Sequence, residues 1–183
     1  LEDEVRFEIL NDLLLHLESQ KNGQERFEEV VQVFAQNLGS TQVQEQVGDF
    51  YLGRHEYSRA LEYYQHALSE RISSPELVIK ALLLQTELHA YQEVIELSGQ
   101  GLVRFPTHPL LYLLQGTAYN ETGEYQLALE RLQQGLTHLD DDPELEVAFY
   151  EQMVVATRAM GAVKEAAGYA RNLARLKLKI LDE

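Results

Sequence analysis

The chain has 183 residues, of which 45% are hydrophobic and 25% are charged, a composition typical of a globular protein. Cysteine is absent, which excludes disulfide frameworks, thiolate nucleophiles and cysteine-bound metal clusters. Fifteen Lys and Arg against thirty Asp and Glu give a net charge of −15, so most of the surface would repel a nucleic-acid backbone or an anionic membrane.

The first 40 residues predict two helices, over 3–20 and 24–38, because apolar residues recur there at helical spacing. The first stripe ends before Gly23, and the second ends at Gly39 and Ser40. The stripes consist of Val5, Ile9, Leu10, Leu13, Leu14 and Leu17, and of Phe27, Val30, Val31 and Phe34.

Proline marks a repeat in the rest of the chain. Pro75, Pro109 and Pro143 are spaced 34 residues apart, and a fixed period of this size indicates a repeat architecture. Proline suits the first position of a helix, because the backbone N–H that proline lacks would have no hydrogen-bond partner there. Ser74 and Asp142 stand just before two of these prolines, and both are good N-cap residues.

Segments 41–74 and 109–142 share residue types at equal offsets, and segment 75–108 keeps part of the pattern. A small residue stands at offset 8, an aromatic residue at offsets 11 and 17, Ala at offset 20 and a small residue at offset 27. These positions are Gly48, Tyr51, Tyr57, Ala60 and Ala67 in the first segment, and Gly116, Tyr119, Tyr125, Ala128 and Gly135 in the other. Small residues at matching places predict helices that approach closely, and Gly123 predicts a left-handed helix end.

After Pro143 the register shifts by four residues, which predicts a divergent repeat over 143–183 with an extended last helix. Gly161, Ala166, Ala170 and Leu173 fit a unit that starts near residue 147. In chain order, the sequence predicts about ten helices: 3–20, 24–38, 41–53, 57–70, 75–89, 91–104, 109–121, 125–138, 143–160 and 163–181.

This pattern resembles the tetratricopeptide repeat, a 34-residue unit of two antiparallel helices. The match covers segments 41–74, 75–108 and 109–142, and the family's tryptophan at offset 4 is replaced by Gln44, Val78 and Tyr112. The resemblance implies an all-α fold, a right-handed superhelical solenoid of helix pairs. Residues 1–183 would form one such domain, in which 1–40 is a degenerate helix pair.

The resemblance also implies a concave groove, lined by the first helix of each pair, that binds a protein or peptide. The candidate partner-binding residues are Glu45, Asp49, Glu76, Ile79, Leu83, Glu87, Leu110, Leu113, Thr117, Asn120, Glu121, Glu151 and Val155. An apolar floor with an acidic rim favours a partner that has apolar anchors and basic flanks. The Lys, Asn and Arg clamp with which one subgroup holds a peptide carboxylate is missing here.

The end of the chain differs in charge from the rest. Residues 158–183 carry six Lys and Arg against three Asp and Glu. Leu173, Leu176 and Ile180 predict a docking seam for a homodimer or a neighbouring domain. The alternative is a capping helix whose basic side chains keep the end of the stack soluble.

No motif for catalysis, a cofactor or a metal stands out, so we expect a non-catalytic scaffold without cofactors. The six histidines lack metal-ligand spacing, and Asp140 to Asp142 lack the pattern of a calcium loop. The open alternatives are a structural spacer or dimerisation segment of a longer protein, such as one of the cell envelope, and an enzyme whose site the sequence does not reveal. The chain begins at Leu1 rather than Met, which predicts a processed product or an excised piece. The compartment stays open between a bacterial periplasm or cell envelope and the cytoplasm.

Overall fold

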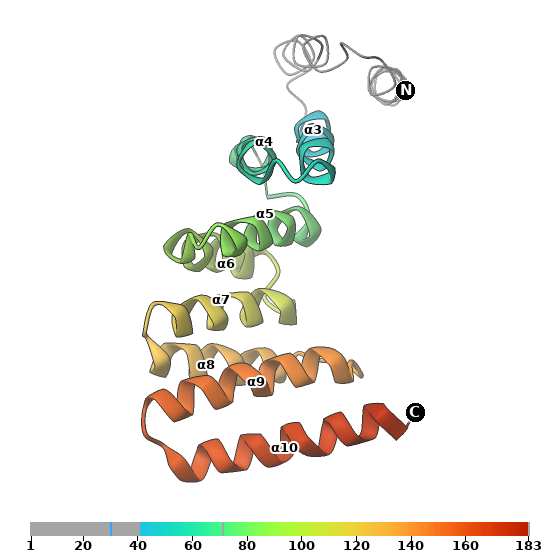
Figure 1. Cartoon of the computed structure of the whole chain (residues 1–183). Coiled ribbons are helices and arrows are strands. Elements are labelled where there is room, and N and C mark those ends of the chain that lie inside the picture. The colour runs from blue at the N-terminus through green and yellow to red at the C-terminus, as the bar shows by residue number, and fades with distance from the viewer. Residues whose placement is uncertain (1–29, 31–40, 71, 183) are drawn as a thin grey trace. The chain divides into compact units, whose positions relative to one another are not determined.

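A computed structural model describes residues 30, 41–70 and 72–182. Over the ranges 41–70 and 72–182 it contains eight helices and no strand (Figure 1). The helices are α3 (Thr41–Gly53), α4 (Tyr57–Glu70), α5 (Pro75–Glu87), α6 (Tyr91–Arg104), α7 (Pro109–Glu121), α8 (Tyr125–Leu136), α9 (Pro143–Ala159) and α10 (Val163–Asp182). All eight agree with the sequence prediction to within two residues at each end. The helices predicted over 3–20 and 24–38 lie outside the described residues.

The chain divides into two compact units between Arg71 and Ile72. Of the described helices, unit 1 contains α3 and α4, and unit 2 contains α5 to α10. Each unit is described by itself below. The prediction that residues 1–183 form one domain stays a prediction.

Unit 2 is a stack of three helix pairs, α5–α6, α7–α8 and α9–α10. Within each pair the two helices pack against each other, and α6 packs on α7 as α8 packs on α9. The first helices also touch one another, α5 with α7 and α7 with α9, and form one layer of the stack (Figure 1). Each pair therefore contacts chiefly its neighbours, as in a helical repeat.

The starts of α5 and α9 confirm the predicted caps. The Ser74 hydroxyl accepts a hydrogen bond from the Leu77 amide at 3.2 Å, and the Asp142 carboxylate accepts one from the Leu145 amide at 2.9 Å. Each cap satisfies an amide that would otherwise lack a partner in the first helical turn. The acidic run before Pro143 is thus a helix start.

The turn inside each helix pair contains a residue with a left-handed backbone, and this residue stands at the same position of every repeat. Positive φ angles occur at His55, His89, Gly123 and Gly161, with values of 60°, 57°, 82° and 73°. At Gly123 the amide donates to the Asn120 carbonyl at 3.1 Å, while the next amide, of Glu124, donates to the Tyr119 carbonyl at 2.8 Å. This is the Schellman arrangement that ends a helix, and it confirms the prediction for Gly123.

The core of unit 2 depends on small residues where helices cross. Ala128 is fully buried, and a Cβ atom added at Gly116 would lie 2.6 Å from the Leu132 Cγ. Gly101, in α6, faces Val78 and Leu111 in the same way. In unit 1, Ala60 and Ala67 are fully buried. These observations confirm that small residues at offsets 8, 20 and 27 allow close packing.

Candidate interaction surface

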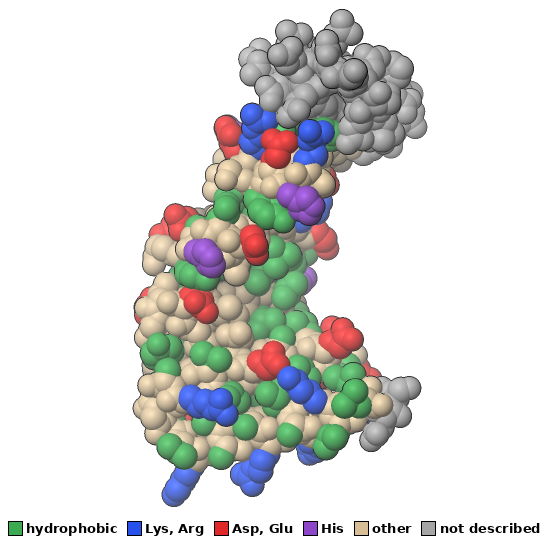
Figure 2. Space-filling model, in the orientation of Figure 1, with side chains coloured by type: hydrophobic (Ala, Val, Ile, Leu, Met, Phe, Trp, Pro, Cys, Tyr) green, Lys and Arg blue, Asp and Glu red, His purple; other side chains and the backbone are tan. Residues whose placement is uncertain are grey.

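The first helices of unit 2 carry most of the predicted groove residues. We call the exposed side of α5, α7 and α9 the first-helix face; Figure 2 shows hydrophobic side chains on it, over α5 and α7. The predicted residues on these three helices are Glu76, Ile79, Leu83, Glu87, Leu110, Leu113, Thr117, Asn120, Glu121, Glu151 and Val155. They do not contribute equally to the surface.

Two large apolar side chains on this face are half exposed. Leu83 of α5 is 51% exposed and Val155 of α9 is 47% exposed. Both stand at offset 9 of their repeats, and Thr117, at the same offset of α7, is partly exposed. Because α7 packs against both α5 and α9, the three residues belong to adjacent helices of one layer.

Four carboxylates accompany these side chains. Glu76 and Glu87 of α5, Glu121 of α7 and Glu151 of α9 are all exposed. Glu151 forms an ion pair with Lys177 of α10, with 2.7 Å between the Lys177 Nζ and the Glu151 Oε1. Both partners are about half exposed, so this pair contributes little to stability.

Other predicted groove residues serve the stack itself. Leu113 is only 8% exposed and packs in the core cluster with Phe149 and Met153. Asn120 is 5% exposed, and its Nδ2 donates to both the backbone carbonyl and the Oε1 of Gln152, each at 3.0 Å. Ile79 and Leu110 are half-buried. The exposed part of the face is therefore narrower than the repeat offsets predicted.

Glu45 and Asp49 belong to unit 1, where the structure links them to Tyr64. The Tyr64 hydroxyl donates to the Asp49 Oδ1 at 2.6 Å. Burial raises the pKa of Tyr64 well above its ordinary value, and the hydrogen bond and charge of Asp49, with the charge of Glu45, raise that pKa further. The ionised phenolate is disfavoured both by loss of water and by nearby carboxylates.

The shifted pKa of Tyr64 predicts a loss of stability at high pH. Below about pH 10 this tyrosine is protonated in both the folded and the unfolded chain. Above that pH the unfolded chain releases the proton while the folded one holds it, so the free energy of unfolding falls as pH rises. Tyr64→Phe should therefore flatten the fall between pH 9 and 11, and should cost about 1 kcal/mol at pH 8 through the lost hydrogen bond.

Urea unfolding followed by circular dichroism at each pH measures this effect. The matched control is Tyr57→Phe, which removes a partly exposed tyrosine hydroxyl from the same helix and should keep the steep fall of the parent chain. Equal slopes for the parent and for Tyr64→Phe would contradict the assignment.

The predicted docking seam on α10 faces inward. Leu176 is 9% exposed, and Leu173 and Ile180 are half-buried, while α10 packs against α9. Sequence reasoning missed a second stripe on α10, whose members are mostly exposed: Val163, Ala167, Ala170, Ala174, Leu178 and Leu181. Its spacing of 4, 3, 4, 4 and 3 residues was the available signal.

The described part of the chain holds neither a metal-ligand cluster nor a membrane-spanning helix. Among those residues, no group of three or more His, Asp or Glu side chains could hold a metal ion. None of the described helices has the length and apolar character to cross a bilayer.

Comparison with known proteins finds similarity in structure. No protein-family model matches the sequence, and no curated protein matches it either. The solved structure "MamA 41-end" from Desulfovibrio magneticus RS-1 superposes with a TM-score of 0.73 at 15% identity, over 94% of this chain and 95% of that one. A second MamA crystal structure gives a TM-score of 0.73 at 14% identity, over 94% of each chain.

A third similar structure is the Sgt2 TPR domain from Aspergillus fumigatus. Its TM-score is 0.56 at 18% identity, over 69% of this chain and 83% of that one. Identities this low establish a common fold and nothing about a shared activity. Together with the helix pairs at 34-residue spacing, the comparison shows that the chain is a helical repeat with the tetratricopeptide-repeat fold.

Proposed function

We propose that the chain is a non-catalytic interaction scaffold that binds a polypeptide, as a helix or an extended segment, on the first-helix face of unit 2. One observation carries this proposal: Leu83 and Val155 are half exposed at the same repeat offset on two helices of one layer. Apolar side chains that gather on a protein surface are typical of a binding site. Concave faces of helical repeats are the surfaces that usually bind partners.

The partner's chemistry follows from the side chains around these two residues. Apolar anchors would cover Leu83 and Val155, and Lys or Arg flanks would approach Glu76, Glu87 and Glu121. Opposite charges speed association and make it sensitive to salt. The net charge of −15 opposes binding of nucleic acid.

A basic amphipathic peptide tests the proposal directly. The probe is an 18-residue fluorescent peptide with Leu on one helical face and Lys on the flanks, and binding is measured by anisotropy. Leu83→Lys and Val155→Lys should each weaken binding at least tenfold, since each removes an apolar contact with the peptide's leucines and adds a cation to a surface that attracts its lysines. Leu113 is unsuitable for such a test because it is buried in the core.

The matched control is Val103→Lys, which places the same charge on α6, away from the first-helix face. Val103 is 88% exposed, so this variant should bind the peptide nearly as tightly as the parent chain. If all three variants bind the probe equally, the first-helix face is not the binding site. The alternative of a structural spacer or dimerisation segment would then be preferred.

A further inference from the structure

The outward side of α10 is an apolar stripe. Val163 is 76% exposed, Leu178 is 63% exposed and Leu181 is 80% exposed. Ala167 and Ala174 are exposed between them, and Ala170 is partly exposed. The side of a helix that faces solvent is normally polar, whereas this stripe is apolar.

Helix α8 is the second helix of the preceding pair, and it shows which helix contact the α10 stripe lacks. Leu129, at offset 21 of its repeat, is 6% exposed, and Leu132, at offset 24, is fully buried. Both belong to the cluster that α9 covers with Phe149 and Met153. The residues at the same offsets of α10 are Ala167, which is exposed, and Ala170, which is partly exposed, and among the described helices α10 packs chiefly against α9. The α10 stripe therefore has the position of an interface between repeats.

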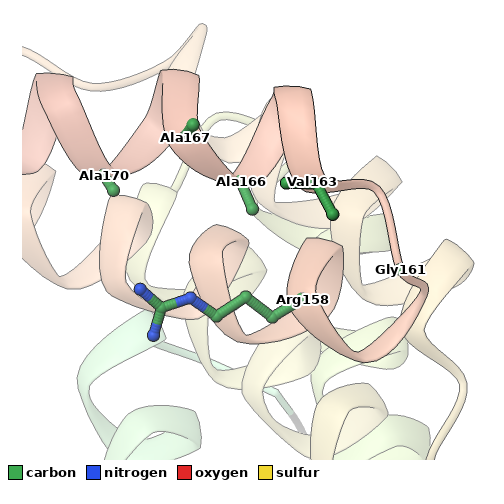
Figure 3. A pocket seen from close by; sticks show the side chains of 6 residues that line it. All are labelled: Arg158, Gly161, Val163, Ala166, Ala167 and Ala170. Atoms are coloured by element: carbon green, nitrogen blue, oxygen red, sulfur yellow. The ribbon is translucent and has the colours of Figure 1, made fainter.

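Helix α9, the first helix of the pair α9–α10, also lacks a contact that its counterpart α7 makes. Asn120 of α7 stands at offset 12, where it is buried and hydrogen-bonded to Gln152 of α9. Arg158 of α9 stands at offset 12 of its own repeat and is exposed. Figure 3 shows the Arg158 side chain on the side of α10 to which Ala166 and Ala170 point. A shallow cavity of about 270 Å³ lies there, lined by Arg158, Gly161, Val163, Ala166, Ala167 and Ala170.

The positive charge beside the α10 stripe limits which kind of partner can cover it. Lys164, Arg171 and Arg175 are exposed along one edge of the stripe, and Arg158 stands by the cavity at its start. Lys and Arg side chains gather around α10 in Figure 2. Residues 158–183 carry six basic and three acidic side chains, whereas residues 1–157 carry nine basic and 27 acidic ones. A symmetric pairing of two α10 helices would set like charges against each other.

We propose that the outer side of α9 and α10 binds one acidic amphipathic helix of a partner protein. This helix takes the place that the first helix of a further repeat would occupy. Its apolar side chains are bulky, because the alanines of α10 leave room where α8 has leucines. Its Asp and Glu side chains face Arg158, Lys164, Arg171 and Arg175. The site is separate from the first-helix face and does not depend on it.

The test uses the full chain and a fluorescent 18-residue helical peptide with Leu on one face and Glu on the flanks. The peptide should bind the parent chain, and Leu178→Glu should weaken binding at least tenfold. Arg171→Glu/Arg175→Glu should weaken it to a similar extent and reduce its dependence on salt. The matched control Val103→Glu changes an equally exposed apolar residue of α6 and should leave binding unchanged.

All substituted side chains are exposed, so circular dichroism should show full helicity for each variant. Leu83→Lys should leave this binding unchanged, which separates the site from the first-helix face. Equal binding to the parent chain and to Leu178→Glu would overturn the proposal. So would a dimer in sedimentation that Leu178→Glu converts to a monomer, because a second copy would then cover the stripe.

Discussion

Replacing Gly135 by Ala is expected to destabilise unit 2 by about 3 kcal/mol. A Cβ atom at this position would lie 2.6 Å from the Tyr112 Cβ and 2.6 Å from the Cε1 atom of the Phe149 ring. The Tyr112 Cβ is attached directly to the backbone of α7, so it cannot turn away as the end of a long side chain would. Either α7 or α9 must move away from α8, and the core cluster of unit 2 must open.

Urea unfolding by circular dichroism measures this cost, and Gly168→Ala is the matched control. Gly168 also lies inside a helix, but a Cβ atom there would meet nothing within 4 Å. Ala is a better helix former than Gly, so the control should be stabilised by about 0.5 to 1 kcal/mol. If both substitutions stabilise the chain, α7, α8 and α9 do not meet at Gly135.

Truncating Phe149 to Ala is expected to cost about 4 kcal/mol, in the range for buried aromatic residues. Phe149 of α9 is fully buried, in the cluster that also holds Leu132 and Met153. The substitution removes the side chain that holds α9 against α8 and leaves a cavity between two repeats. The exchange of amide hydrogens in α9 and α10 should rise more than in α5 and α6, because each pair depends chiefly on its neighbours.

The control for this variant is Leu127→Ala in α8. Leu127 is 39% exposed, so its truncation should cost less than about 1 kcal/mol. A similar small cost for Phe149→Ala would show that α9 does not pack on α8 through this ring.

The helix pairs could be predicted from the sequence because local chemistry and the repeat period agree. Pro75, Pro109 and Pro143 mark the starts of helices, and Gly123 and Gly161 mark the turns between them. The left-handed residues His55 and His89 were harder to recognise, because histidine adopts a positive φ far less readily than glycine does. Their place in the repeat, 34 residues apart, was the only signal.

The surface was predicted less completely, because repeat offsets assign a direction to a side chain but not its neighbours. Leu113 follows the offset of a groove residue and is nevertheless buried by the next pair. Asn120 donates a hydrogen bond to Gln152 of α9. These two residues are 32 positions apart, so no local sequence pattern reveals the contact. On α10, Leu176 lay in the more obvious seam, while the residues that remain exposed form the less regular stripe.

Proton NMR contacts at Gly135 test the central claim most directly, namely that helix pairs of 34-residue period stack through small residues. The claim predicts strong nuclear Overhauser effects from the Gly135 Hα protons to the Phe149 ring protons and to the Tyr112 Hβ protons. These contacts join α7, α8 and α9 at one point. Assigned resonances of these three residues without such cross-peaks would contradict the stacked arrangement.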